Sequence, residues 1–141
     1  MQLSTLLTTC IRLVFSARKY DHVTLLLQEL HWLQAPERIL FRLAVLVYRC
    51  LHGLAPSYLA AELHRVSDVD SRRRLRSASS AALIIRPTLR SSIGDRSFPV
   101  AAARTWNSLP PSVTASQSVQ TFRKRLKTEL FQRSYTTASL P

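Results

Sequence analysis

Apolar residues recur at helical spacing in the first half of the chain. A helix is predicted over about 22–31, where four apolar residues share one face: Val23, Leu26, Leu27 and Leu30. Asp21 stands before this helix as its expected N-cap, and His31 and Trp32 close it. A shorter helix is predicted over about 57–64, directly after Pro56.

The helix predicted between these two has the clearest ends. Pro36 suits a first helical position, and Gly53 suits the residue just past the last turn. Apolar residues cover most of the circumference, and the remaining stripe carries Arg38, Arg42 and Arg49. We therefore expect a helix that is packed on several sides and has one basic seam.

The pattern changes after residue 64. Residues 65–81 are rich in Arg, Ser and Asp, so we predict a basic, mobile loop there. Residues 82–85 form a short apolar run that ends before Pro87, and this pattern is typical of a strand. We expect that strand to pair within a small β-hairpin near 82–93.

Two further helices are predicted in the basic half of the chain, 82–133. The first is capped by Ser97 and runs to about Asn107. The second begins at Ser116 or Ser118 and carries a narrow apolar stripe: Val119, Phe122, Leu126 and Leu130. The prediction is a mainly α fold of about five helices in a single module, 1–141. Its parts are a variable lead-in at 1–20, an apolar helical half at 21–64, the loop, the basic half, and a tail at 134–141.

Length and composition limit the class of protein. The chain has 141 residues and a net charge of +12. Its length corresponds to one domain, and its hydrophobic share of 46% is too high for intrinsic disorder. No window reaches the ~20 apolar residues of a membrane span, so we expect a soluble chain with no membrane as partner. If the chain is expressed, we expect it to be intracellular, either nuclear or cytoplasmic. A mitochondrial presequence over residues 1–20 is an alternative, because this stretch has cations and no acid.

Catalytic and metal-binding patterns are missing from the sequence. With 2 Gly in the chain there is no dinucleotide fingerprint and no P-loop, and neither a nucleophile elbow nor a zinc-protease helix occurs. Cys50 and His52 are two residues apart on a helix and point to different sides, so Cys50 is expected to be buried filler. Asp68 and Asp70 are expected in a solvated loop. We predict no enzyme, no cofactor, no metal and no small-molecule substrate.

The positive charge is concentrated in the second half. Residues 1–70 hold 7 Lys/Arg and 6 Asp/Glu, whereas residues 71–141 hold 13 and 2. Two clusters supply the candidate nucleic-acid-binding residues: Arg72, Arg73, Arg74 and Arg76 in the loop, and Arg123, Lys124 and Lys127 in the last helix. Such clusters neutralise phosphate backbones, and Arg forms forked hydrogen bonds to phosphate oxygens. The alternatives are solvated faces, nuclear-import signals, or docking surfaces for an acidic protein.

Three aromatic residues, Trp106, Phe131 and Tyr135, could stack on unpaired bases. The core interpretation is preferred for the aromatic residues, because Phe98, Trp106 and Phe122 lie on apolar faces.

Taken together, several blocks resemble the region that follows the polymerase in non-LTR (LINE-type) retrotransposon reverse transcriptases. The blocks, in order, are FSARKYDHVT at 15–24, LHWL at 30–33, CLHGLAPSYL at 50–59, GDRSFPVAAA at 94–103, WNSLP at 106–110 and the closing helix at 122–131. The chain departs from the family's usual pattern at 33–36, which reads LQAP, and at 86–90, which reads RPTLR.

The resemblance implies a detached C-terminal region of a retroelement polyprotein. The family's Tyr/Phe-x-Asp-Asp polymerase motif and its endonuclease lie outside this region, so no catalytic residue carries over. The tail is thought to hold element RNA or target DNA near the polymerase, which agrees with the charge pattern. The expected function is therefore non-catalytic binding of RNA or DNA. The alternative is a structural module that packs on the missing polymerase domain and has no nucleic-acid role of its own.

Overall fold

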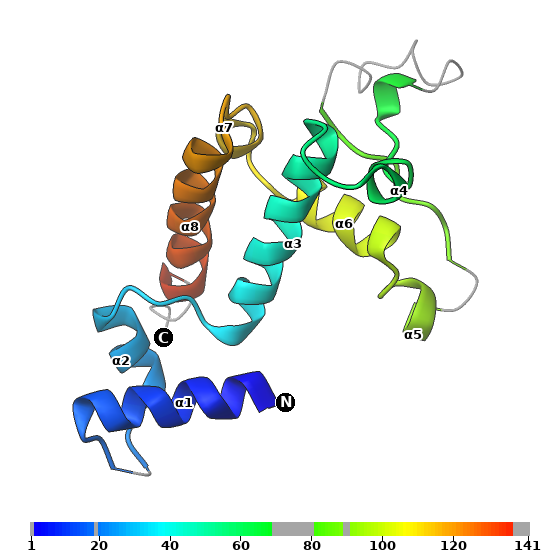
Figure 1. Ribbon diagram of the computed structural model, residues 1–141. Helices are drawn as coiled ribbons and strands as arrows, with labels where there is room; N and C mark the ends of the chain where they lie inside the picture. The colour runs from blue at the N-terminus through cyan, green and yellow to red at the C-terminus, as the bar shows by residue number, and fades with distance from the viewer. Residues whose placement is uncertain (1, 19, 69–80, 89–90, 137–141) are drawn as a thin grey trace. The chain divides into compact units, whose positions relative to one another are not determined.

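The computed structural model describes residues 2–18, 20–68, 81–88 and 91–136, and over these residues the fold is mainly α, as predicted (Figure 1). In chain order the helices are α1 (Gln2–Phe15), α2 (Val23–Glu29), α3 (Ala35–Leu51), α4 (Ser57–Ala60), the 3₁₀ helix η1 (Val66–Asp68), α5 (Ser91–Gly94), α6 (Phe98–Asn107), α7 (Pro111–Thr114) and α8 (Val119–Thr136). The chain forms two compact units, one from residues 1–41 and 124–141, the other from residues 42–123.

The first unit has a small apolar core where α1 and α2 pack together. Ile11 of α1, Leu27 of α2 and Tyr135 of α8 are buried in it, and Trp32 and Phe131 pack against them. The Tyr135 hydroxyl donates a hydrogen bond to the backbone oxygen of Trp32 at 2.7 Å. Burial raises the pKa of this phenol, and the nearby Glu37 carboxylate raises it further.

Helix α1 was not predicted, since residues 1–20 were expected to form a variable lead-in. Its threonines are accommodated inside the helix: the Thr9 hydroxyl donates to the backbone oxygen of Thr5 at 2.9 Å, one turn earlier.

Asp21 is not the N-cap of α2, so that prediction was wrong. The helix begins at Val23 with His22 in the cap position, and the Asp21 carboxylate instead accepts a hydrogen bond from the backbone N–H of Arg18 at 2.6 Å.

Three helices end in the same way. In a Schellman motif the first residue past the cap adopts a left-handed conformation, and the residue after it donates to a carbonyl five positions back. The left-handed residues are Ser16 after α1 (φ 49°), His31 after α2 (φ 52°) and Gly53 after α3 (φ 68°). The backbone hydrogen bonds that complete the motif are donated by the N–H groups of Ala17, Trp32 and Leu54. Their acceptors are the backbone oxygens of Arg12 at 2.9 Å, Leu27 at 2.9 Å and Arg49 at 2.7 Å, respectively.

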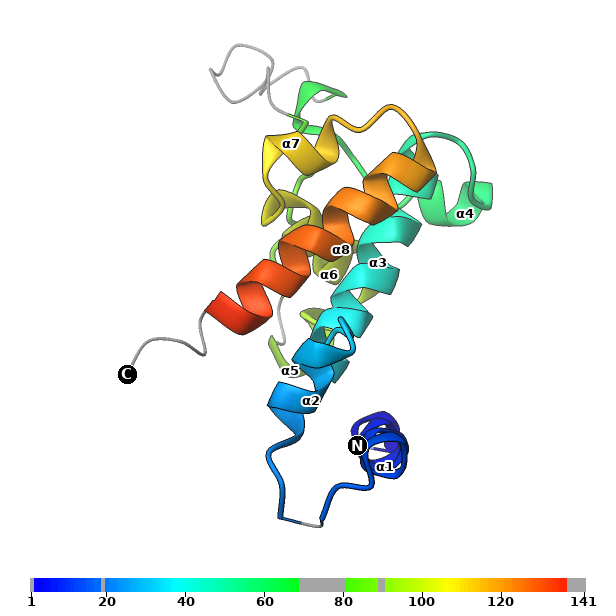
Figure 2. The ribbon, with the colours of Figure 1, turned by 90° about the vertical axis from the view of Figure 1, so that its left-hand side faces the viewer.

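The second unit is built around Tyr48 of α3. Its ring stacks on Phe122 with centroids 4.5 Å apart, and lies 6.5 Å from the ring of Trp106 in α6. The Tyr48 hydroxyl donates to the backbone oxygen of Ser116 at 2.8 Å, so this buried polar group has its partner. Figures 1 and 2 show α6 beside the C-terminal part of α3, as these ring contacts require.

The predicted hairpin within 82–93 was wrong. Residues 82–84 instead run antiparallel to residues 64–66: the N–H of Val66 donates to Ala82 at 3.0 Å, and that of Ile84 to His64 at 2.9 Å. Residues 91–94, where the second strand was expected, form α5. A Cβ added at Gly94 would come within 2.6 Å of the Thr88 Cβ, so a residue without a side chain is required at this close approach.

Candidate nucleic-acid interface

The predicted start of the last helix is confirmed at Ser118, whose hydroxyl oxygen accepts a hydrogen bond from the backbone N–H of Thr121 at 3.2 Å. From there α8 carries the predicted apolar stripe inward. Phe122 and Leu126 are completely buried and Leu130 is nearly so. The apolar residues fix the rotation of the helix about its axis, and that rotation determines which residues meet solvent.

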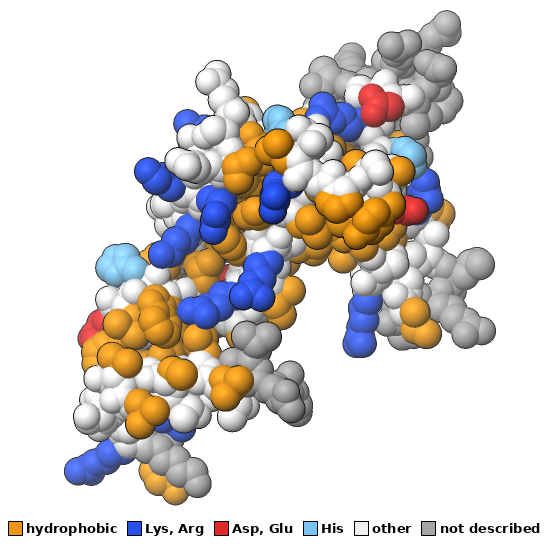
Figure 3. Space-filling view, in the orientation of Figure 1, with side chains coloured by type: hydrophobic (Ala, Val, Ile, Leu, Met, Phe, Trp, Pro, Cys, Tyr) orange, Lys and Arg blue, Asp and Glu red, His pale blue; other side chains and the backbone are white. Residues whose placement is uncertain are grey.

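The candidate cations of α8 are on the solvent side. Arg123 belongs to the second unit, Lys124 and Lys127 belong to the first, and all three side chains are exposed. The acid Glu129 of the same helix pairs with Arg133 at 2.8 Å, one turn on. Within the described part of the chain, neither Lys124 nor Lys127 forms an ion pair with an acid. In Figure 3, Lys and Arg side chains stand out among apolar side chains on the face shown, and acidic side chains are few.

The other predicted cluster, Arg72, Arg73, Arg74 and Arg76, lies outside the described residues. The basic loop predicted at 65–81 stays a prediction over 69–80, which also lie outside the described residues.

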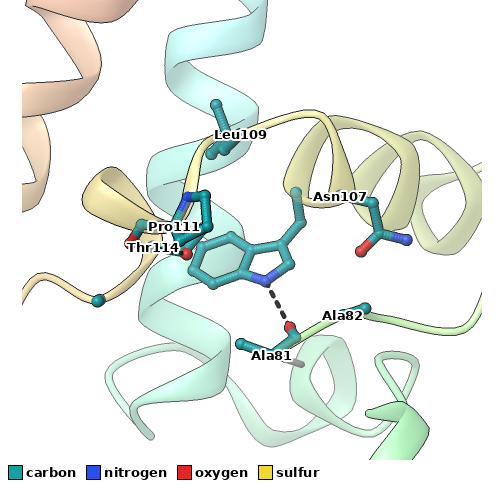
Figure 4. Close-up of a pocket in the computed structure, with 8 residues that line it drawn as sticks. Ala81, Ala82, Asn107, Leu109, Pro111 and Thr114 are labelled. Carbon is teal, nitrogen blue, oxygen red and sulfur yellow. Dashed lines mark hydrogen bonds between the residues drawn. The ribbon is translucent and has the colours of Figure 1, made fainter. Parts of the chain in front are cut away.

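An open hollow of about 570 Å³ lies beside Trp106 in the second unit. Figure 4 shows its lining, which is mostly apolar and includes Ala82, Leu109 and Pro111. The indole N–H of Trp106 donates to the backbone oxygen of Ala81 at 2.9 Å and is not available to a ligand. The hollow thus has mostly apolar walls, and the indole N–H of Trp106 already has its hydrogen-bond partner within the protein.

The neighbouring Asn107 is occupied in the same way. Its amide oxygen accepts from the N–H of Leu83 at 2.9 Å, and its amide nitrogen donates to the Leu83 oxygen at 2.8 Å. One side chain therefore binds both backbone groups of Leu83, which is 2% exposed. Trp106 and Asn107 together hold residues 81–83, and we interpret them as structural residues. The core interpretation of Trp106 and Phe122 is confirmed by their burial.

Cys50 is buried, as predicted, and burial raises the pKa of its thiol despite the opposing effect of Arg49. His52 is exposed and stacks on Tyr48, with ring centroids 4.1 Å apart. Over the described ranges, no cluster of three metal-ligating side chains occurs.

A smaller hollow, of about 270 Å³, lies in the first unit and was not anticipated from the sequence. It is lined by His31, Lys127, Thr128, Phe131 and Gln132. The imidazole of His31 and the ring of Phe131 are nearly parallel, with an angle of 8° between planes and 5.4 Å between centroids. The sequence indicated that a helix ends at His31, but not that its ring would lie beside that of Phe131 in α8, about a hundred residues further along the chain.

Comparisons with protein-family models, with curated proteins and with solved structures found no match for this chain. None of the described helices is both long and apolar enough to cross a bilayer.

Proposed function

We propose that this chain is a non-catalytic nucleic-acid-binding module, the C-terminal region of a LINE-type reverse transcriptase, which binds the backbone of RNA or DNA. The observation that carries the proposal is the solvent-facing set of cations on α8. Lys124 and Lys127 are exposed and have no acidic partner in the described structure, while the only acid on that helix is paired with Arg133.

Electrostatics supports phosphate as the ligand. Residues 71–141 carry 13 basic and 2 acidic residues, an imbalance that attracts polyanions. Each phosphate that a cation neutralises releases condensed counterions, so affinity falls with salt in proportion to the number of contacts. Because such contacts carry no sequence information, binding is expected to show little sequence preference.

The test is a salt series of the dissociation constant for labelled RNA and for duplex DNA. The logarithm of the association constant falls linearly with the logarithm of the salt concentration. Replacing Lys124 and Lys127 by Gln should make this slope less steep by about 0.7–0.9 for each lysine that contacts a phosphate. The matched control replaces Glu129 and Arg133 by Gln, which removes the ion pair and leaves the net charge at +12. The control should keep the original slope.

An unchanged slope in the lysine variant would remove Lys124 and Lys127 from the interface. Replacing Arg72, Arg73, Arg74 and Arg76 by Ala tests the loop cluster in the same assay. Adding Arg123→Gln to the lysine variant completes the α8 cluster, and if neither complete set of changes alters the slope, backbone binding by these clusters is refuted.

The second candidate is a module that packs on the polymerase domain, and the exposed apolar surface of α1 favours it. Leu6, Cys10 and Leu13 follow one another at helical spacing on one stripe, and all three are exposed, Leu6 at 65% and Leu13 at 76%. An unpartnered apolar stripe should make the isolated chain self-associate. Sedimentation at rising protein concentration, compared with a Leu13→Glu variant, tests this candidate.

A further inference from the structure

His31 occupies a backbone position that disfavours it. It is the left-handed residue of the Schellman motif that ends α2, with φ at 52°. This conformation is less favourable for an L-residue than the right-handed helix, and glycine is the usual occupant. The equivalent position after α3 is occupied by Gly53. The backbone of α2 gives no reason for an imidazole at this place.

The side chain is what distinguishes this position. Its ring lies nearly parallel to that of Phe131, with centroids 5.4 Å apart, and His31 is exposed whereas Phe131 is half-buried. Phe131 is held in turn by Tyr135, 4.5 Å away between centroids, and by the core of the first unit. The rings of Tyr135, Phe131 and His31 therefore lie in contact one after another, from the buried Tyr135 to the exposed His31.

The surroundings of the stack have the groups that a nucleotide requires. Lys127 supplies a positive charge at the same hollow, and Gln132 supplies an amide that can both donate and accept hydrogen bonds. The Thr128 hydroxyl donates to the Lys124 backbone oxygen at 3.1 Å and keeps its capacity to accept. Pockets for drug-sized ligands measure about 300–1,000 Å³, so a hollow of about 270 Å³ suits a smaller fragment such as one base.

We infer that the hollow of His31, Lys127 and Phe131 is a stacking site for one unpaired nucleobase, whose adjacent phosphate is neutralised by Lys127. The base extends the His31–Phe131 stack at its solvent end. The inference rests on the proposed function and adds to it a preference for single-stranded over duplex nucleic acid, because a paired base cannot leave its helix without losing its own stacking.

The test uses His31→Gly in the full chain. Glycine suits the left-handed backbone, so this variant removes the imidazole without disturbing the end of α2. The matched control is Ser16→Gly, which makes the same backbone exchange at the equivalent position after α1, where no ring is lost. Circular dichroism verifies that both variants are folded.

The probe is a single-stranded oligonucleotide of about twelve nucleotides with 2-aminopurine at its centre, measured beside its duplex. Binding to the wild type should quench the fluorescent base through stacking. His31→Gly should abolish the quenching and weaken single-strand binding about tenfold, while duplex binding and the Ser16→Gly variant remain as in the wild type. Phe131→Leu, which keeps an apolar contact and removes the aromatic face, should have the same effect.

Three results would overturn the inference. If His31→Gly binds and quenches the single strand as the wild type does, there is no stacking site, although the proposed function stands. If it weakens duplex and single strand equally, His31 does not act by stacking. If the wild type binds neither probe, the proposed function fails and the inference falls with it.

Discussion

Replacing Gly53 by Ala should lower the free energy of unfolding by about 1 kcal/mol. Gly53 has φ at 68°, and a Cβ added there would meet no atom within 4 Å, so the whole effect is conformational. The left-handed conformation costs an L-residue about 1–2 kcal/mol. The loss of backbone freedom in the unfolded chain offsets about 0.4–1 kcal/mol of that cost.

The measurement is urea unfolding followed by far-UV circular dichroism, with the midpoint and the slope fitted separately. A shift of the midpoint at constant slope reports a change in stability. Gly53→Asn is the matched variant, because asparagine tolerates the left-handed region better than alanine and should lose less stability. The reasoning is refuted if Gly53→Ala is as stable as the wild type, or if Ala and Asn cost the same.

Two further predictions concern hydrogen bonds of single side chains. Asn107→Leu leaves the buried N–H and oxygen of Leu83 without their partners and should cost about 1–3 kcal/mol in the same unfolding assay, whereas a smaller loss would mean that water replaces the amide. Tyr135 has a pKa raised by burial, so its contribution to stability is complete below about pH 10 and is lost as the pH rises through the higher pKa of the folded state. Tyr135→Phe should therefore reduce the alkaline loss of stability in a pH series of melting temperatures, and an identical loss in both proteins would contradict this.

Local chemistry explains the elements that were predicted well. The bounds of α3, Ala35–Leu51, follow from Pro36 and Gly53, each of which acts on its own turn of the helix. The start of α8 follows from a hydroxyl that binds an N–H within the next turn. The buried stripe of α8 and its exposed cations follow from helical periodicity alone.

The elements and contacts that were not predicted from the sequence depend on residues far apart in the chain or on segments too short to show a pattern. The segment 82–84 finds its partners at residues 64–66 and at Asn107, so its pairing depends on contacts that no local window contains. The short helices α5 and α7 are single turns, for which helical periodicity gives no signal. His31 was predicted only as the end of a helix, because its partner Phe131 is brought to it by packing and not by sequence proximity.

The two hydrogen bonds between the Asn107 side chain and the backbone of Leu83 affect whether copies of this chain can pair with one another. An extended segment offers hydrogen-bonding groups along both edges, and an open edge is a template for pairing with another chain. Residues 82 and 84 bond to residues 64–66 along one edge, and the Asn107 amide occupies the N–H and oxygen of Leu83, which alternation places on the other. A single side chain thus takes the place of a neighbouring strand and protects this short extended segment from edge-to-edge aggregation.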